Sequence, residues 1–319
     1  MRTPAIINPH LPQLLYALAA ANVQESIKFP SRRASSASFL AGALPRSLAP
    51  RARCECRWQV APDQANGLPL LTDSLRYAVF GDVHANLTAL DAVLADIDRH
   101  GRFDAIISNG DQLAGGPRPL EVWDRLQERG ALMLVGNTER DLLLGDVPPP
   151  PWGLAKRGML KAVFFYCRDL LSEDLIETAA GLPFAIRIRA HADSPVLMIA
   201  HANANNVDDF LTPTTSPRVY DRLLGKEDRP QMQITGHIHS PQDVLIGGVR
   251  VVRPGSVGLK YERDVQHLAN WLEVWFDHEN DAWACRLHKV EWDNETEIEV
   301  GSRLDYPGVT ILPGFWRFE

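Results

Sequence analysis

The chain has little cysteine and no long apolar run. Four cysteines occur in 319 residues, and only Cys54 and Cys56 lie close together. Two neighbouring thiols without further partners make a poor zinc site, and scattered thiols do not build a disulfide framework. We therefore expect unpaired thiols in a reducing, cytoplasmic compartment. No stretch of about 18 or more apolar residues occurs, which argues against a membrane span.

Acidic side chains are scarce at the start of the chain. Residues 1–70 contain eight Lys or Arg and three Asp or Glu, so they carry +5 and the rest of the chain carries −12 of a net −7. Their richness in Arg, Ser, Ala and Pro is typical of a transit-type leader or a disordered extension, and a start codon placed too far upstream would look the same. We assign residues 1–72 to a disordered basic extension and residues 73–319 to one folded domain. The acidic body argues against broad nucleic-acid binding through phosphate neutralisation.

From about Ser74 onward, strand-like and helix-like segments alternate, which predicts an α/β fold. The apolar run Tyr77–Phe80 predicts a buried strand, and the helical spacing of apolar residues in Leu87–Ile97 predicts a helix directly after it. The remaining predictions are strands at 104–108, 131–135, 184–189, 196–200 and 232–235, helices at 117–129, 154–171 and 173–180, and hairpins over 243–252 and 271–290. Residues 294–319 give no readable pattern.

Five of the predicted strands end in a corner that carries side chains able to bind a metal. These corners are Gly81-Asp82-Val83-His84, Gly110-Asp111, Gly136-Asn137, Ala200-His201 and Gly236-His237-Ile238-His239. Ligands of open α/β sheets bind beyond the carboxyl ends of the strands, so we expect these donors to meet at one edge. Carboxylates, imidazoles and an amide oxygen without a thiolate suit Mn²⁺, Fe, Zn²⁺ or Ni²⁺. A carboxylate shared by two ions would hold them about 3.5–4 Å apart, which is a geometry used in phosphoryl chemistry.

Each of these residues, taken alone, has an ordinary structural interpretation. A single Asp after a strand is usually a turn or cap residue, and a single His is more often a hydrogen-bonded residue than a ligand. The signal therefore depends on the ordered set of five corners, each of which follows an apolar run.

This ordered set resembles the calcineurin-like metallophosphoesterase family. The resemblance rests on Gly81-Asp82-Val83-His84-Ala85-Asn86, Gly110-Asp111, Gly136-Asn137, His201 and Gly236-His237-Ile238-His239. Gly116-Pro117-Arg118-Pro119 and Pro254-Gly255-Ser256-Val257-Gly258 make it similar to the small prokaryotic, YfcE-type phosphodiesterase branch. The resemblance covers about Tyr77–Leu259 and implies a four-layer α/β/β/α sandwich.

The resemblance also implies roles for individual residues. Asp82, His84 and His239 would bind one divalent metal, Asn137, His201 and His237 would bind a second, and Asp111 would bridge the two. Manganese is the expected metal, with Fe, Zn or Ni as alternatives. A bridging hydroxide would attack phosphorus in line, and Asn86 and Asn137 would help to position phosphate oxygens.

One departure from the family bears on the chemistry. Many members have a His after the Asn of the third corner, where it can donate a proton to the leaving group. Here Thr138 takes that position, and a threonine hydroxyl is not an acid near neutral pH. We therefore expect substrates with a good leaving group, or protonation by another group or by water. Glu139 is predicted to orient a neighbouring group.

The sequence thus predicts a dinuclear metal-dependent phosphoesterase that acts on a small phosphodiester or nucleotide-type substrate. Two alternatives stay open: a phosphomonoesterase or protein phosphatase on the same site, and a non-catalytic interaction module on the same fold, like the retromer small subunit. An oligomer also stays open. Residues with weaker signals are Arg253, Asn203, Asn205 and Asn206 as pocket residues, Tyr220 and Tyr261 as base-stacking or packing residues, and five histidines not expected to be ligands, His100, His191, His267, His278 and His288.

Overall fold

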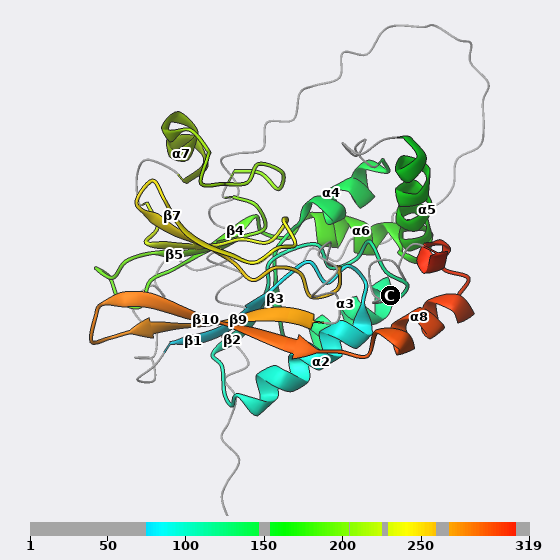
Figure 1. Cartoon of the computed structure of the whole chain (residues 1–319), viewed down its shortest axis with the longest axis horizontal. Helices are drawn as coiled ribbons and strands as arrows, with labels where there is room; N and C mark the ends of the chain where they lie inside the picture. The colour runs from blue at the N-terminus through cyan, green and yellow to red at the C-terminus, as the bar shows by residue number, and fades with distance from the viewer. Residues whose placement is uncertain (1–74, 147–153, 204, 225–228, 260–267, 311–319) are drawn as a thin grey trace, which may run out of the picture.

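Two five-stranded sheets form from the apolar runs of the sequence, and helices lie on their outer faces (Figure 1). The computed structural model describes residues 75–146, 154–203, 205–224, 229–259 and 268–310. The predicted extension at 1–72, together with Cys54, Cys56 and Tyr261, lies outside the described residues.

The first sheet contains the strands that lead into the first three corners. Its order is β10-β9-β1-β2-β3. The strands are β1 (Arg76–Phe80), β2 (Ala105–Ser108), β3 (Leu132–Met133), β9 (Leu268–Asp277) and β10 (Ala282–Glu291). The central strand β1 pairs in parallel with β2 and antiparallel with β9, and β2 pairs in parallel with β3. The carboxyl ends of β1, β2 and β3 therefore lie at the same edge.

The second sheet contains the strands that lead into the last two corners. Its order is β4-β5-β6-β8-β7. The strands are β4 (Ala185–Ile188), β5 (Leu197–Ala200), β6 (Met232–Ile234), β7 (Gln242–Ile246) and β8 (Val249–Arg253). Strands β5, β6 and β8 run in parallel, and β7 and β8 form the hairpin predicted from Gly247-Gly248.

The helices are α2 (Leu87–Arg99), α3 (Pro119–Glu128), α4 (Asn137–Leu144), α5 (Leu154–Leu170), α6 (Glu173–Ala180), α7 (Pro217–Leu224) and α8 (Asn294–Arg303), followed by the 3₁₀ turn η3 (Pro307–Thr310). Asn86 caps α2, since its side chain accepts a hydrogen bond from the Ala89 amide, and Ser172 caps α6 in the same way. None of the described helices is long and apolar enough to cross a membrane.

Three apolar clusters hold the layers together. One cluster lies between the sheets, where residues such as Val79 and Leu272 of the first sheet meet Ile199 and Ile234 of the second. A second cluster packs α2, α3, α5, α6 and α8 against the outer face of the first sheet, and a third packs α7 against β7 and β8. The layers are therefore helices, sheet, sheet and helix, which confirms the predicted α/β/β/α sandwich.

The structure confirms the predicted strand and helix order, with end points that differ by a few residues. The prediction lacked α4, α7 and α8. Among the four cysteines, the two that the structure describes, Cys167 and Cys285, are free thiols.

Candidate metal centre

The five corners meet at one edge, as predicted. Backbone hydrogen bonds link the first two corners, from Asp82 N to Gly110 O at 3.0 Å and from His84 N to Asp111 O at 2.9 Å. The two sheets are joined at the same place, because His237 N donates to Asp82 Oδ1 at 3.1 Å. Within the second sheet, Gly236 N donates to His201 O at 2.7 Å and links the last two corners. Six of the seven predicted ligands therefore belong to one interlocked set of loops, and the corner of Asn137 joins them because the Thr138 amide donates to Asp111 Oδ1 at 2.9 Å.

Four of these seven residues have left-handed backbone conformations. The φ angles are 52° at Asp82, 50° at His84, 57° at Asp111 and 67° at His237. Such conformations cost a non-glycine residue about 1–3 kcal/mol each, and they concentrate at functional sites. The hydrogen bonds between corners hold the backbone in these conformations, so the loops fix the directions of the side chains.

Glycine permits the close approach between corners. A Cβ at Gly110, where φ is 113°, would lie 2.4 Å from Nδ1 of His201. A Cβ at Gly136 would lie 2.1 Å from Oδ1 of Asp111. Any side chain at either position would displace a candidate ligand on the neighbouring corner.

The donor atoms form two groups. Nε2 of His84 lies 3.0 Å from Nε2 of His239, and His239 Nε2 lies 3.8 Å from Asp82 Oδ1. In the second group, the Asn137 Oδ1 atom lies 3.0 Å from His201 Nε2 and 2.8 Å from His237 Nδ1. Asp111 lies between the groups: its Oδ2 is 3.8 Å from His84 Nε2, and its Oδ1 is 3.4 Å from His201 Nε2.

Hydrogen bonds to backbone carbonyls orient two of the imidazoles as metal ligands require. His84 Nδ1 lies 2.6 Å from Ala114 O, and His201 Nδ1 lies 3.1 Å from Asn109 O. A carbonyl only accepts, so each Nδ1 carries a proton, and in the neutral imidazole each Nε2 then keeps its lone pair. Those lone pairs face the other candidate ligands, where a shared cation would relieve their mutual repulsion.

The carboxylates and the amide also fit a cation. Oδ2 of Asp82 is buried and has no hydrogen-bond partner among the described residues, and an unpaired buried oxygen is costly unless a cation binds it. The oxygen of Asn137 faces two ring nitrogens, an arrangement that a cation between them explains. Turning the carboxamide over would instead let its nitrogen donate to both rings.

The pKa shifts favour neutral imidazoles beside a charged carboxylate. Burial lowers the pKa of His201 to about 4, and it lowers the pKa of His237 and His239 as well. Burial raises the pKa of Asp111, but the neighbouring His201 and His84 outweigh this effect and bring it down to about 2. Burial and the charge of Asp111 raise the pKa of Asp82 well above its usual range. A divalent cation would offset the repulsion between the two carboxylates.

Glu139 holds the loop that carries Asp111, as predicted. Its Oε2 accepts from the Asp111 and Gly136 amides at 2.9 Å each, and its Oε1 accepts from the Gln112 amide at 2.8 Å. Thr138 contacts the same aspartate, since its amide and hydroxyl donate to Asp111 Oδ1 at 2.9 and 3.0 Å. The hydroxyl therefore orients the central carboxylate at the position where many family members have a proton donor.

The second predicted phosphate contact, Asn86, is fully buried. Its Oδ1 caps α2, and its Nδ2 donates to Gly258 O at 3.1 Å. These bonds give it a clear structural role, and its contact with phosphate stays a prediction.

The weaker candidates lie mostly outside the centre. Asn203 and Asn206 form hydrogen bonds within their own loop, and Tyr220 packs with the apolar cluster under α7. A third potential metal group, Asp96, His100 and His288, lies at the far end of α2 from Asn86. From the sequence, His100 and His288 are not expected to be ligands, and that expectation stays a prediction.

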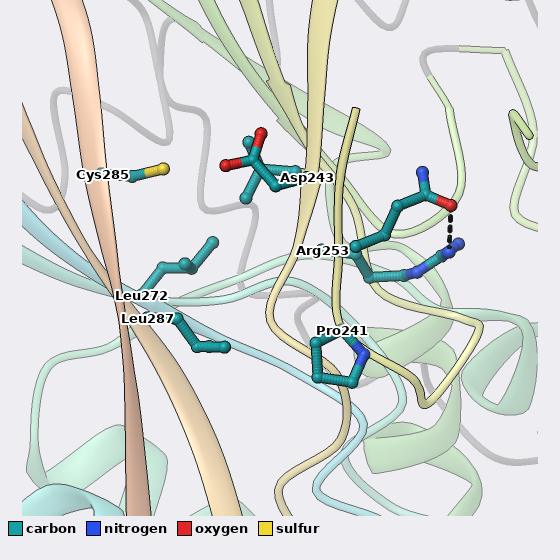
Figure 2. A pocket seen from close by; sticks show the side chains of 8 residues that line it. Pro241, Asp243, Arg253, Leu272, Cys285 and Leu287 are labelled. Atoms are coloured by element: carbon teal, nitrogen blue, oxygen red, sulfur yellow. Dashed lines mark hydrogen bonds between the residues drawn. The ribbon is translucent and has the colours of Figure 1, made fainter. Parts of the chain in front are cut away.

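A cavity of about 210 Å³ opens between the edges of the two sheets, and Figure 2 shows its lining. Leu272, Cys285 and Leu287 of the first sheet face Asp243 and Arg253 of the second. None of the seven candidate ligands lines this cavity. Arg253 donates to Ser240 O at 3.1 Å and to Gln242 Oε1 at 2.8 Å, and no carboxylate among the described residues pairs with it.

The sandwich fold and this donor set match a class of phosphoesterases that use divalent metals. The chain belongs to the calcineurin-like phosphoesterase superfamily, because the family model of that superfamily domain matches residues 75–271.

Solved structures share the fold. Hypothetical protein PH1004 from Pyrococcus horikoshii OT3 has 18% sequence identity and a TM-score of 0.61, and the match covers 77% of this chain and 99% of that chain. A metallophosphoesterase from Sphaerobacter thermophilus has 22% identity and a TM-score of 0.53, with 75% of this chain and 98% of that chain covered. No curated protein sequence gives a significant match.

Proposed function

We propose that the protein is a dinuclear metal-dependent phosphoesterase that prefers phosphodiesters. The observation that carries the proposal is the grouping of six O- and N-donor residues around Asp111, with a buried Asp82 oxygen that has no hydrogen-bond partner among the described residues. In this assignment Asp82, His84 and His239 hold one cation, and Asn137, His201 and His237 hold the other. Asp111 contacts both.

Two divalent cations, when bound, lower the pKa of a water molecule toward neutrality and neutralise charge that develops on phosphorus oxygens. The chain holds these ligands by its own contacts. The carbonyls of Ala114 and Asn109 fix the imidazoles of His84 and His201, and Thr138 fixes the Asp111 carboxylate. Pre-oriented ligands need little rearrangement during the reaction.

Thr138 argues against alkyl monoesters as substrates. Its hydroxyl donates to Asp111, and a hydroxyl is a poor acid near neutral pH, so it does not replace a protonating histidine. Poor leaving groups, such as the alkoxide of an alkyl monoester, then react slowly. Groups that leave as stable anions are the favoured substrates.

The test uses the purified chain with Mn²⁺, an aryl phosphodiester and the matching monoester. We expect metal-dependent turnover of the diester above that of the monoester. Monoester turnover well above diester turnover would support the phosphomonoesterase alternative. If neither ester turns over with any divalent metal, the enzyme proposal is wrong and a non-catalytic interaction module replaces it.

A further inference from the structure

An exposed aromatic ring lies at the rim of the candidate metal centre. Phe210 remains 39% exposed, and its ring centroid is 5.8 Å from that of His237 at an interplanar angle of 48°. His237 in turn lies 2.8 Å from the Asn137 oxygen. The uncovered part of the Phe210 ring is therefore apolar surface directly beside the donor groups.

Asparagine side chains fix the loop that presents this ring. Oδ1 of Asn203 accepts from the Asn206 amide at 3.1 Å, and Oδ1 of Asn206 accepts from the Asp208 and Asp209 amides at 3.0 and 2.7 Å. The next residue after Phe210, Leu211, is 2% exposed and packs in the cluster under α7. The ring is thus held before any ligand binds, which reduces the entropic cost of using it.

Arg140 ties the same loop to the metal-binding corner. It lies on α4, which starts at Asn137, and its guanidinium pairs with Asp208 of the loop. Its Nε and NH2 donate to Asp141 at 3.0 and 2.7 Å. Because these donors are engaged by carboxylates, Arg140 acts as a positioning residue for the loop.

We propose that Phe210 is a stacking platform for a planar aromatic ring of the substrate, either a nucleobase or an aryl group. The inference rests on the proposed function and narrows its substrate class. Every planar ring offers a π face. Stacking on a fixed aromatic side chain therefore favours ligands that carry a planar ring, whichever ring it is. This selection agrees with the lack of a proton donor at Thr138, since nucleoside phosphates and phenolates leave as stable anions without protonation.

Binding measurements test the platform without relying on turnover. Calorimetry of the Mn²⁺-treated chain compares AMP with ribose 5-phosphate, and phenyl phosphate with methyl phosphate. The two pairs separate a nucleobase from a simple aryl group. We expect each ring-bearing ligand to bind roughly fivefold or more tightly than its partner, the scale of base stacking on a protein aromatic.

Variants assign the effect to the ring. Phe210→Leu should remove the preference, and Phe210→Tyr should keep it. Phe165 on α5 is a matched control, since it is another phenylalanine with 40% exposure, and Phe165→Leu should leave the preference unchanged.

Equal binding within both ligand pairs, or a preference that survives in Phe210→Leu, would overturn the platform. These outcomes are separable from failure of the proposed function. Ester hydrolysis without ring-dependent binding refutes the platform alone, whereas ring-dependent binding without hydrolysis of any ester supports the platform and refutes the enzyme.

Discussion

The most demanding stability prediction concerns Glu297, an acidic residue that is fully buried in α8. Its Oε2 accepts from the Thr88 hydroxyl at 2.6 Å and from the Thr88 amide at 3.3 Å in the first turn of α2. Arg118 pairs with the same carboxylate, and its side chain is 15% exposed. The carboxylate therefore joins α8, the start of α2 and the loop before α3.

Glu297→Ala leaves the Arg118 charge largely buried without its partner. Breaking a buried pair in this way costs about 3–5 kcal/mol. The substitution also removes an anion from the N-terminal turn of α2, where anions are favoured. In a domain of this size each kcal/mol shifts Tm by about 2–4 °C, so we expect a fall of roughly 6–20 °C.

Urea unfolding followed by circular dichroism measures the loss of unfolding free energy, with Arg129→Ala as the control. Arg129 pairs with Asp98, whose side chain is 61% exposed, and an exposed pair contributes at most about 1 kcal/mol. The double substitution Arg118→Met with Glu297→Leu should recover much of the loss, because apolar replacement of a buried pair is often neutral. Equal losses for Glu297→Ala and Arg129→Ala would refute this reasoning.

Three further predictions concern the centre and the surface of the first sheet. Asp111→Asn should abolish activity and reduce metal content while the circular dichroism spectrum stays unchanged, because it removes the charge shared by the two donor groups; wild-type activity would refute the assignment of Asp111. Mn²⁺ affinity, measured by calorimetry, should weaken as the pH is lowered, because burial and Asp111 raise the pKa of Asp82 and binding must release its proton; a pH-independent Kd would contradict this. Burial raises the pKa of Glu273, but hydrogen bonds from His288 and Arg76 outweigh the effect of burial, so the folded pKa lies below the unfolded value of about 4.3. The ionised carboxylate therefore stabilises the fold above the unfolded pKa, and this stabilisation is lost as the pH falls through the folded pKa. Glu273→Gln should therefore lower Tm at pH 7 by more than at pH 3, and an equal loss at both would count against the linkage.

The sheets and the candidate centre could be predicted because their signals are local. Each corner follows an apolar strand, and parallel strands bring their carboxyl ends to one edge. The prediction placed Asp82 and His201 at that edge from this rule alone. It could not supply the left-handed backbone at Asp82, since side-chain patterns do not reveal φ at non-glycine residues.

The parts that the sequence did not predict depend on tertiary contacts. Helix α8 buries Glu297, Ile298 and Gly301, so a charged residue and a glycine occupy positions where a helical pattern would show apolar side chains. The cap role of Asn86 follows from its position before Leu87, but its bond to Gly258 joins residues 172 positions apart. The sequence did not indicate a role for Phe210, because a single aromatic residue in a loop has no pattern that shows which part of the molecule its ring lies beside.

The division of the donors between two sheets has a consequence for folding. His84 follows a strand of the first sheet and His239 follows a strand of the second, 155 positions later. Contacts between distant segments form late and slow the search for the native state. Cations bound as proposed would meet their full ligand set only after the sheets have docked. They would therefore slow unfolding while leaving the folding rate nearly unchanged. The centre would in this way raise the kinetic stability of the contact between the two sheets.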